Sequence, residues 1–344
     1  MNDSLLLQKT IVDMHVHVAG VGAGGSGCYV APHMRRNWRY RIYLRAFGVR
    51  EQDLELHGDA LVVQTVSKLI AESRAVKQAV ILALDGVVDG SGELDLEQTV
   101  TCVPNEFVAG EVARHPNLLF GASVNPYRPD ALQRLEKVVA DGAVLLKWLP
   151  AIQHIDPADR RLVPFYRRLQ ELGLPLLTHA GHERSFSRAA PHYGDPQRLR
   201  LPLSLGVTVI AAHAATTGKS EGEDNMLRLI RMFPDYPKLY ADISSLTQAN
   251  KLFFLTRLLR HNVHDRLIYG TDFPLINTAL VSPCYYPFRL SLGEVARIAA
   301  CSNPWDKDVL LKRALGVPED VFTRWEDLGL GRSTEEGLCS PGDD

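Results

Sequence analysis

The chain has 344 residues, of which 46% are hydrophobic and 23% charged, and its formal net charge is −2. This is the composition of a globular protein with enough apolar residues for a large core. The near-neutral charge predicts no general attraction to nucleic acid or to an anionic membrane. The longest apolar runs have the length of strands, so we expect no membrane-spanning helix.

The start of the chain and the cysteines predict a cytoplasmic location. The opening sequence MNDSLLLQKT has neither the basic region nor the long apolar stretch of a signal peptide. The cysteines are dispersed and form no CxxC pair, which is typical of free thiols in a reducing compartment. They are Cys28, Cys102, Cys284, Cys301 and Cys339.

Eight short apolar runs recur along the chain, and most are followed by a segment with helical periodicity. The runs lack strict alternation, which is typical of strands that are buried on both faces of a parallel sheet. They cover residues 10–16, 78–84, 118–124, 142–149, 173–180, 206–214, 238–244 and 266–272.

Helical patterns lie between these runs at residues 130–140, 157–173, 223–233 and 249–260. In the first of them, Leu132, Leu135, Val138 and Val139 share one stripe. The repeated strand–helix alternation predicts an α/β fold, a (β/α)8 TIM barrel. A doubly wound sheet is the alternative, and it would need a glycine fingerprint directly after a strand.

The connection between the first two predicted strands is too long for a single helix. Residues 19–60 open with the glycine-rich AGVGAGGSG and continue with the arginine-rich HMRRNWRYRIYLR. We interpret this segment as an insertion that forms a lid. A phosphate-binding loop is the alternative, although no GK[ST] follows the glycines. We predict one barrel domain over residues 1–330 and a flexible tail over 331–344, which is polar.

Six polar side chains fall at or near the C-terminal ends of predicted strands, where barrel active sites form. They are His15, His17, Lys147, His179, His213 and Asp272. His15 and His17 are two residues apart, so they point to the same side of their strand. Each residue alone has a structural explanation, such as a hydrogen-bonded histidine or a turn aspartate. Their joint placement favours a metal site, and imidazoles with a carboxylate suit Zn²⁺ or a similar ion.

The stretches around these residues resemble the amidohydrolase superfamily. They are IVDMHVH, GAVLLKWLP, PLLTHAG, VTVIAAHA, KLYADIS and LIYGTDFP, and they extend from Ile11 to Pro274. In detail they are similar to the amidohydrolase-2 branch, which includes aminocarboxymuconate semialdehyde decarboxylase. The resemblance implies that His15, His17, His179 and Asp272 bind a divalent metal, with zinc as the default.

The resemblance leaves the number of ions open. In binuclear members of the superfamily a lysine at the position of Lys147 is carboxylated and bridges two ions, whereas a single ion suffices in the decarboxylase branch. His213 would accordingly bind a second ion or hydrogen-bond the metal-bound water.

The implied activity is that of a metal-dependent hydrolase, in which a metal-bound water cleaves an amide, lactone or ester of a small, carboxylate-bearing substrate. Asp272 would accept the proton of the water, and His213 would hold the nucleophile. A non-oxidative decarboxylase and a barrel that binds a ligand without turnover are the alternatives.

Substrate binding is expected from loops at the mouth of the barrel. The candidates are His154, His182, Arg184 and the lid residue Arg39, whose guanidinium could bind a carboxylate. The competing explanation places Arg39 on a solvated helix face, and His154 and His182 at the surface or in support of other site residues. Asp242 could orient a ligand histidine. We expect a small-molecule partner and no nucleic acid or membrane, and many relatives form dimers, which leaves a homodimer open.

Overall fold

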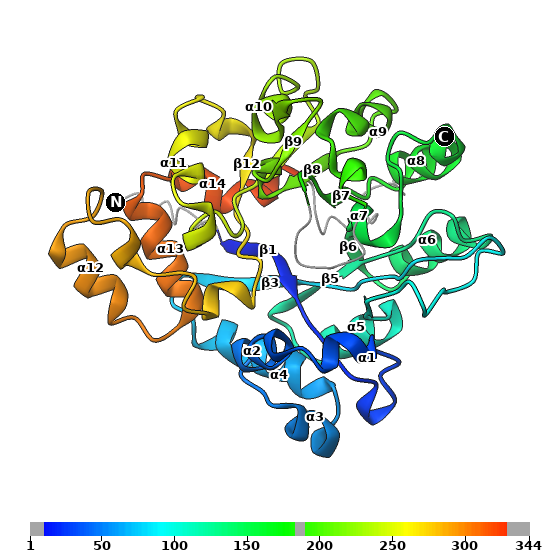
Figure 1. Cartoon of the computed structure of the whole chain (residues 1–344), viewed down its shortest axis with the longest axis horizontal. Coiled ribbons are helices and arrows are strands. Elements are labelled where there is room, and N and C mark those ends of the chain that lie inside the picture. The colour runs from blue at the N-terminus through cyan, green and yellow to red at the C-terminus, as the bar shows by residue number, and fades with distance from the viewer. Residues whose placement is uncertain (1–9, 183–189, 329–344) are drawn as a thin grey trace, which may run out of the picture.

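A parallel eight-stranded sheet lies at the centre of the computed structural model, which describes residues 10–182 and 190–328, and helices surround it (Figure 1). In spatial order the strands are β1 (Ile11–His17), β3 (Val76–Leu82), β5 (Leu118–Ala122), β6 (Ala143–Trp148), β7 (Leu176–His179), β8 (Val209–Ala212), β11 (Leu239–Asp242) and β12 (Leu267–Ile268). Each overlaps one of the eight predicted runs, in the predicted order.

Backbone contacts join the first and last strands of this sheet. Beyond β12 the chain continues beside β1, where the N–H of His17 donates to the carbonyl of Phe273 (3.0 Å) and the N–H of Asp272 to that of His15 (2.9 Å). Val16 and Phe273 also form a parallel bridge. Because the two edges meet, the fold is a TIM barrel, as predicted, and the doubly wound alternative is wrong.

The outer layer contains the helices that follow the strands. They are α4 (Ala60–Glu72), α5 (Asn105–Val112), α6 (Ala131–Ala140), α7 (Pro150–Gln153), α8 (Val163–Glu171), α9 (Arg200–Ser204), α10 (Asn225–Ile230), α11 (Phe254–Leu259), α12 (Leu292–Ala299), α13 (Pro304–Ala314) and α14 (Glu319–Thr323). Helices α6, α8, α10 and α11 fall within the four predicted helical segments. On α6 the buried stripe is narrower than predicted, because Leu132 remains 41% exposed.

The connection from β1 to β3 contains several short elements before α4. They are a 3-10 turn (Ala23–Gly25), β2 (Tyr29–Val30), α1 (Pro32–Arg35), α2 (Trp38–Ala46) and α3 (Glu51–His57). In Figure 1 this blue part of the chain gathers on one side of the barrel. Its role as a lid stays a prediction.

The glycine-rich stretch wraps around a buried carboxylate. Asp59 accepts hydrogen bonds from the N–H groups of Val21 and Gly22, both at 2.9 Å, and from the hydroxyl of Ser26. The approach is so close that a Cβ on Gly20 would lie 2.3 Å from Asp59 Oδ2. Asp59 already occupies these donors, so Gly20 allows a close backbone approach, and the contacts argue against the phosphate-loop alternative.

Two apolar clusters divide the core. The buried members of the inner cluster all come from strands: Val12, Met14, Val80, Leu82, Leu145, Leu177, Ile210, Ala212 and Ile268. The outer cluster joins the opposite faces of the strands to the helices. A side chain's cluster therefore tells whether it faces the inside of the barrel.

The expectations about membrane-spanning helices and cysteines can be compared with the described residues. No helix within them is long and apolar enough to cross a bilayer. Their four cysteines form no disulfide, while Cys339 lies outside the described ranges.

Candidate metal centre

Strand alternation brings part of the predicted site into the barrel. Lys147 follows the inner residue Leu145 by two positions on β6, and His179 follows Leu177 by two on β7. Asp242 ends β11 and is fully buried. These side chains point inward because successive strand residues alternate between the two faces.

A β-bulge brings the histidines of β1 into the same space. Met14 belongs to the inner cluster and Val16 to the outer one, although strict alternation would place both on one face. Between Asp13 and Val16, β1 advances three residues while β3 advances two. Such a bulge reverses the alternation of the residues that follow it. It therefore turns His15 and His17 inward together.

Three residues near the cluster, His213, Asp272 and Ser245, have left-handed backbone conformations. His213, which directly follows β8, has a φ of 55°, and Asp272 has a φ of 62°. Ser245, beyond the end of β11, has a φ of 55° as well. Left-handed conformations in residues other than glycine are costly and concentrate at functional sites. Their occurrence around one end of the barrel supports a functional site there.

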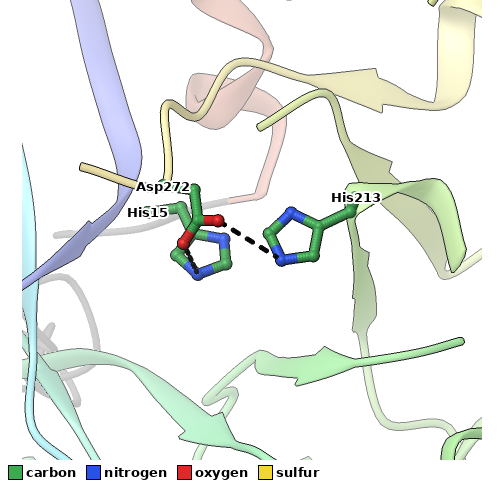
Figure 2. Close-up of side chains that lie close together, drawn as sticks. All are labelled: His15, His213 and Asp272. Carbon is green, nitrogen blue, oxygen red and sulfur yellow. Dashed lines mark ion pairs between the residues drawn. The ribbon is translucent and has the colours of Figure 1, made fainter. Parts of the chain in front are cut away.

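The carboxylate of Asp272 lies among three imidazoles. Its Oδ1 is 3.4 Å from Nε2 of His17 and 3.6 Å from Nε2 of His15, and its Oδ2 is 3.8 Å from Nε2 of His213. Figure 2 shows Asp272 with the rings of His15 and His213 turned toward it. The Nε2 atoms of His15 and His17 are 3.1 Å apart.

These separations fit one bound cation. Ligands about 2.1 Å from an ion lie about 3.0 Å apart in octahedral and about 3.4 Å apart in tetrahedral geometry. The distances of 3.1, 3.4 and 3.6 Å among His15, His17 and Asp272 are close to these values. Ligand atoms of His15, His213 and Asp272 also lie within 4.8 Å of one another. A divalent metal site here is thus plausible on its donor atoms and its geometry.

Asp242 holds the imidazole of His15 and the backbone of His213. Its Oδ2 lies 2.8 Å from Nδ1 of His15, and its Oδ1 accepts the backbone N–H of His213 at 2.8 Å. Ser244 adds its hydroxyl, 2.8 Å from Nδ1 of His213. A carboxylate on Nδ1 fixes the ring with Nε2 free for an ion. Asp242 is therefore placed to orient the ring of His15, the role suggested for it from the sequence.

Burial favours the neutral form of His15 and His213. Burial lowers the pKa of His15 to about 4, with help from the charge of Lys147 and against the opposing charge of Asp242. Burial also lowers the pKa of His213 well below its usual value, and the nearby Lys251 lowers it further. Neutral imidazole is the form that binds metal.

Asp272 remains ionised. Burial by itself would raise the pKa of this carboxyl, but its hydrogen bond with His17 and the charges of His15 and His17 bring the pKa to about 2. At neutral pH the group is therefore an anion that can bind a cation or accept a proton.

Lys147 lies at the floor of this cluster. Its side chain is fully buried, and its Nζ lies 2.9 Å from Nε2 of His15. His179 lies beside His213, with the two ring centres 5.4 Å apart. The structure thus brings all six predicted residues to one end of the barrel. Carboxylation of Lys147 stays a prediction.

A cavity of about 190 Å³ opens beside the cluster, and His17, His179, His213 and Asp272 line one side of it. The rest of its described wall is apolar apart from the hydroxyl groups of Thr101, Tyr40 and Tyr43. The apolar and aromatic members are Val18, Ala19, Val30, Met34, Tyr40, Tyr43, Leu44, Phe47, Leu82, Leu84, Val100, Val103, Leu149, Pro274 and Leu275. No arginine or lysine belongs to the part of the wall that the structure describes.

The predicted substrate-binding residues lie apart from this wall or beyond the described ranges. Arg39 is exposed on α2, with its guanidinium 5.8 Å from the ring centre of Trp38. His154 ends α7 in a left-handed conformation (φ 55°), and His182 follows β7. Neither is among the residues that line the cavity. Arg184 lies outside the described residues, so these four assignments stay predictions.

Sequence reasoning missed the residues that support the site. The hydroxyls of Ser244 and Ser245 both lie near Nδ1 of His213, at 2.8 and 3.2 Å. Nζ of Lys251 in turn donates to Ser245 Oγ. The serine hydroxyls of DISS (residues 242–245), at the end of a predicted strand, were the available signal. The cavity wall on α2 was missed as well, although Tyr40, Leu44 and Phe47 recur at helical spacing.

Comparison with known proteins agrees with this architecture. A family model described as Amidohydrolase matches residues 12–300. A search of curated proteins found no match.

Solved structures share the fold at low sequence identity. A provisionally named 2-pyrone-4,6-dicarboxylic acid hydrolase from Pseudomonas putida is 15% identical, with a TM-score of 0.50 over 93% of this chain and 97% of that one. The Metarhizium anisopliae protein IDCase is 13% identical, with a TM-score of 0.50 over 94% and 98%. 5-Carboxyvanillate decarboxylase from Sphingomonas paucimobilis is 13% identical, with a TM-score of 0.48 over 91% and 95%.

Proposed function

Because the chain belongs to the amidohydrolase family, whose model spans most of the barrel, we propose that this metal-dependent enzyme hydrolyses an ester, lactone or amide of a small molecule. The observation that carries the proposal is the position of Asp272. Its ionised carboxylate lies within 4 Å of three imidazoles that also face the cavity or the ion site. A base in this place can accept the proton of an attacking water.

His15, His17 and Asp272 would hold the ion, because their donor atoms have the separations of ligands on one cation. A divalent ion, for which zinc is our proposal, supplies a Lewis acid that polarises a carbonyl and acidifies water. Asp272 would take the proton from the water and return it to the leaving group. His213, held through Nδ1 by Ser244, would present Nε2 to the developing negative charge.

The number of ions depends on Lys147. With an unmodified amine, whose Nζ lies beside His15, the described side chains provide one ion site, and we expect one ion per chain. Carboxylation of the amine would add a bridge toward His179 and His213. Metal analysis of wild type and Lys147→Ala separates the cases: two ions falling to fewer indicates the bridge, and one ion in both proteins excludes it.

Metal analysis and a substrate panel test the reaction. Purified protein should contain divalent metal, and esters, lactones or amides should be hydrolysed. Asp272→Asn should lower kcat by at least about 100-fold, the usual effect of losing a general base. Release of carbon dioxide from carboxylates without hydrolysis would establish the decarboxylase alternative instead. A protein without bound metal and without turnover would indicate the ligand-binding barrel.

A further inference from the structure

Helix α13 has a buried polar face outside the metal centre. Trp305, Asp308 and Lys312 are buried and lie three and four residues apart, so they share one side of the helix, which we call the α13 face. Asp308 and Lys312 form an ion pair of 2.7 Å. A buried pair of this kind is weak evidence for stability, but it can fix one arrangement of its neighbours. The neighbours here are residues 269–273, YGTDF, which include Asp272.

The ion pair holds the first two residues of this segment. Asp308 accepts a hydrogen bond from the hydroxyl of Tyr269 at 3.0 Å, and Nζ of Lys312 donates to the carbonyl of Gly270 at 2.8 Å. Nζ of Lys312 also lies 4.8 Å from the centre of the Tyr269 ring. The charged residues of the α13 face therefore hold both a side chain and the backbone directly before Thr271.

Trp305 and Asp13 hold the next residue. Asp13 is fully buried, and its Oδ1 accepts the backbone N–H groups of His15 and Thr271, both at 3.0 Å. Its Oδ2 accepts the hydroxyl of Thr271 at 2.5 Å and the indole N–H of Trp305 at 2.7 Å. One carboxylate thus joins the strand that carries His15 to the segment that carries Asp272.

The residue after Asp272 is attached to the same network. The ring of Phe273 stacks on that of Trp305, with centres 4.6 Å apart, and the N–H of Phe273 donates to Thr271 Oγ1 at 3.1 Å. Asp272 itself has the left-handed φ of 62°. A costly conformation of this kind persists only where the surrounding structure determines it. The contacts on both sides of Asp272 meet this condition.

We propose that Asp13 and the α13 face are positioning residues, which set the place of Asp272 relative to His15. They act through the backbone and through residues adjacent to the metal-binding side chains. This inference rests on the metal site of the proposed function, because it assigns the geometry of that site to a network behind it. A disturbed network should therefore weaken metal binding and loosen residues 269–273, although every ligand is still present.

Two substitutions and their combination test the proposal, with Co²⁺ as the probe. Asp13→Asn can keep its oxygen toward the two backbone N–H groups, but its NH₂ then faces the indole N–H of Trp305. Because two donors oppose each other, we expect at least about tenfold weaker Co²⁺ binding, measured by chelator competition. Trp305→Phe removes the indole donor, and adding it to Asp13→Asn should restore the affinity by at least about threefold. Losses that simply multiply in the double variant would overturn the proposal.

Trp325→Phe is the matched control. The indole N–H of Trp325 also donates to one acceptor, the carbonyl of Thr10 at 2.8 Å, and Thr10 directly precedes β1 at the end of the strand away from His17. Losing this donor should lower stability without changing the Co²⁺ affinity or the visible spectrum of the bound ion. An equal loss of affinity in Trp325→Phe and Asp13→Asn would indicate a general structural effect and refute the positioning role.

Hydrogen exchange in the metal-free protein provides a readout that does not depend on the ion. In Asp13→Asn the amides of residues 269–273 should exchange at least about tenfold faster, while those of β6 keep their rate. The double variant should exchange more slowly than Asp13→Asn, and Trp325→Phe should match wild type in this segment. Unchanged exchange of residues 269–273 in Asp13→Asn would overturn the proposal. If the wild-type protein binds no Co²⁺, the proposed function fails, and these exchange rates still decide whether the network positions Asp272.

Discussion

Replacing Asp242 with asparagine tests how the site holds its histidines. Asp242 uses its two oxygens differently: Oδ2 faces Nδ1 of His15, while Oδ1 accepts the N–H groups of His213 and Ser244. Asparagine can keep the Oδ1 contacts, but it then places an amide NH₂ against Nδ1 of His15. The ring must accept there and carry its proton on Nε2, which blocks that nitrogen as a metal ligand.

The expected loss is 10- to 100-fold in metal affinity, which corresponds to about 1.4 to 2.7 kcal/mol. Competition with a chromophoric chelator measures the dissociation constant, and circular dichroism verifies that the variant is folded. Asp306→Asn is the matched control. Asp306 lies at the start of α13, and its buried carboxylate accepts hydrogen bonds from Ser73, Arg74 and Ala75 rather than from a histidine of the site. If Asp242→Asn binds metal as tightly as wild type and Asp306→Asn, the proposed role of Asp242 is wrong.

Three further predictions concern stability. Asp59→Ala removes the acceptor of the Val21 and Gly22 N–H groups and should lower the free energy of unfolding by about 3 kcal/mol, measured by denaturant titration. Tyr40→Phe should raise it by about 1 kcal/mol, because the buried Tyr40 hydroxyl has no hydrogen-bond partner among the described residues; destabilisation would reveal such a partner. Burial alone would raise the pKa of Asp306, but hydrogen bonds from Ser73, Ala75 and Arg74 bring it below the usual 3.8. The ionised form therefore stabilises the fold above pH 3.8, and the difference in unfolding free energy between wild type and Asp306→Asn should shrink as the pH falls below this value.

The local sequence was sufficient to predict the strands and part of the metal site. The eight strands could be predicted because runs such as residues 142–149 are apolar on both faces, which is a property of neighbouring residues in the chain. The inward position of Lys147 and His179 follows from simple alternation within these runs. The joint occurrence of histidines, a lysine and an aspartate at strand ends was sufficient to predict a metal site.

The walls of the cavity depend on contacts between distant parts of the chain. Val30, Phe47, Val100 and Leu275 line one space although they lie far apart in sequence. The arginines of α2 could be identified from the sequence because charge is visible there, whereas the apolar face that lines the cavity depends on the packing of the helix. Only the packing of α2 against the barrel decided which face looks into the cavity.

The sequence by itself determined the barrel, the order of its strands and the residue types at their ends, because burial on both faces leaves a local pattern of apolar residues. The tertiary structure decided how His15 and His17 reach the site. Strict alternation would place Val16 on the inner side with Met14 and turn His15 and His17 outward. The bulge opposite β3 places Val16 outside and both histidines inside. A bulge is a mismatch between two paired strands, so it is a property of the pair and appears in neither strand's sequence alone.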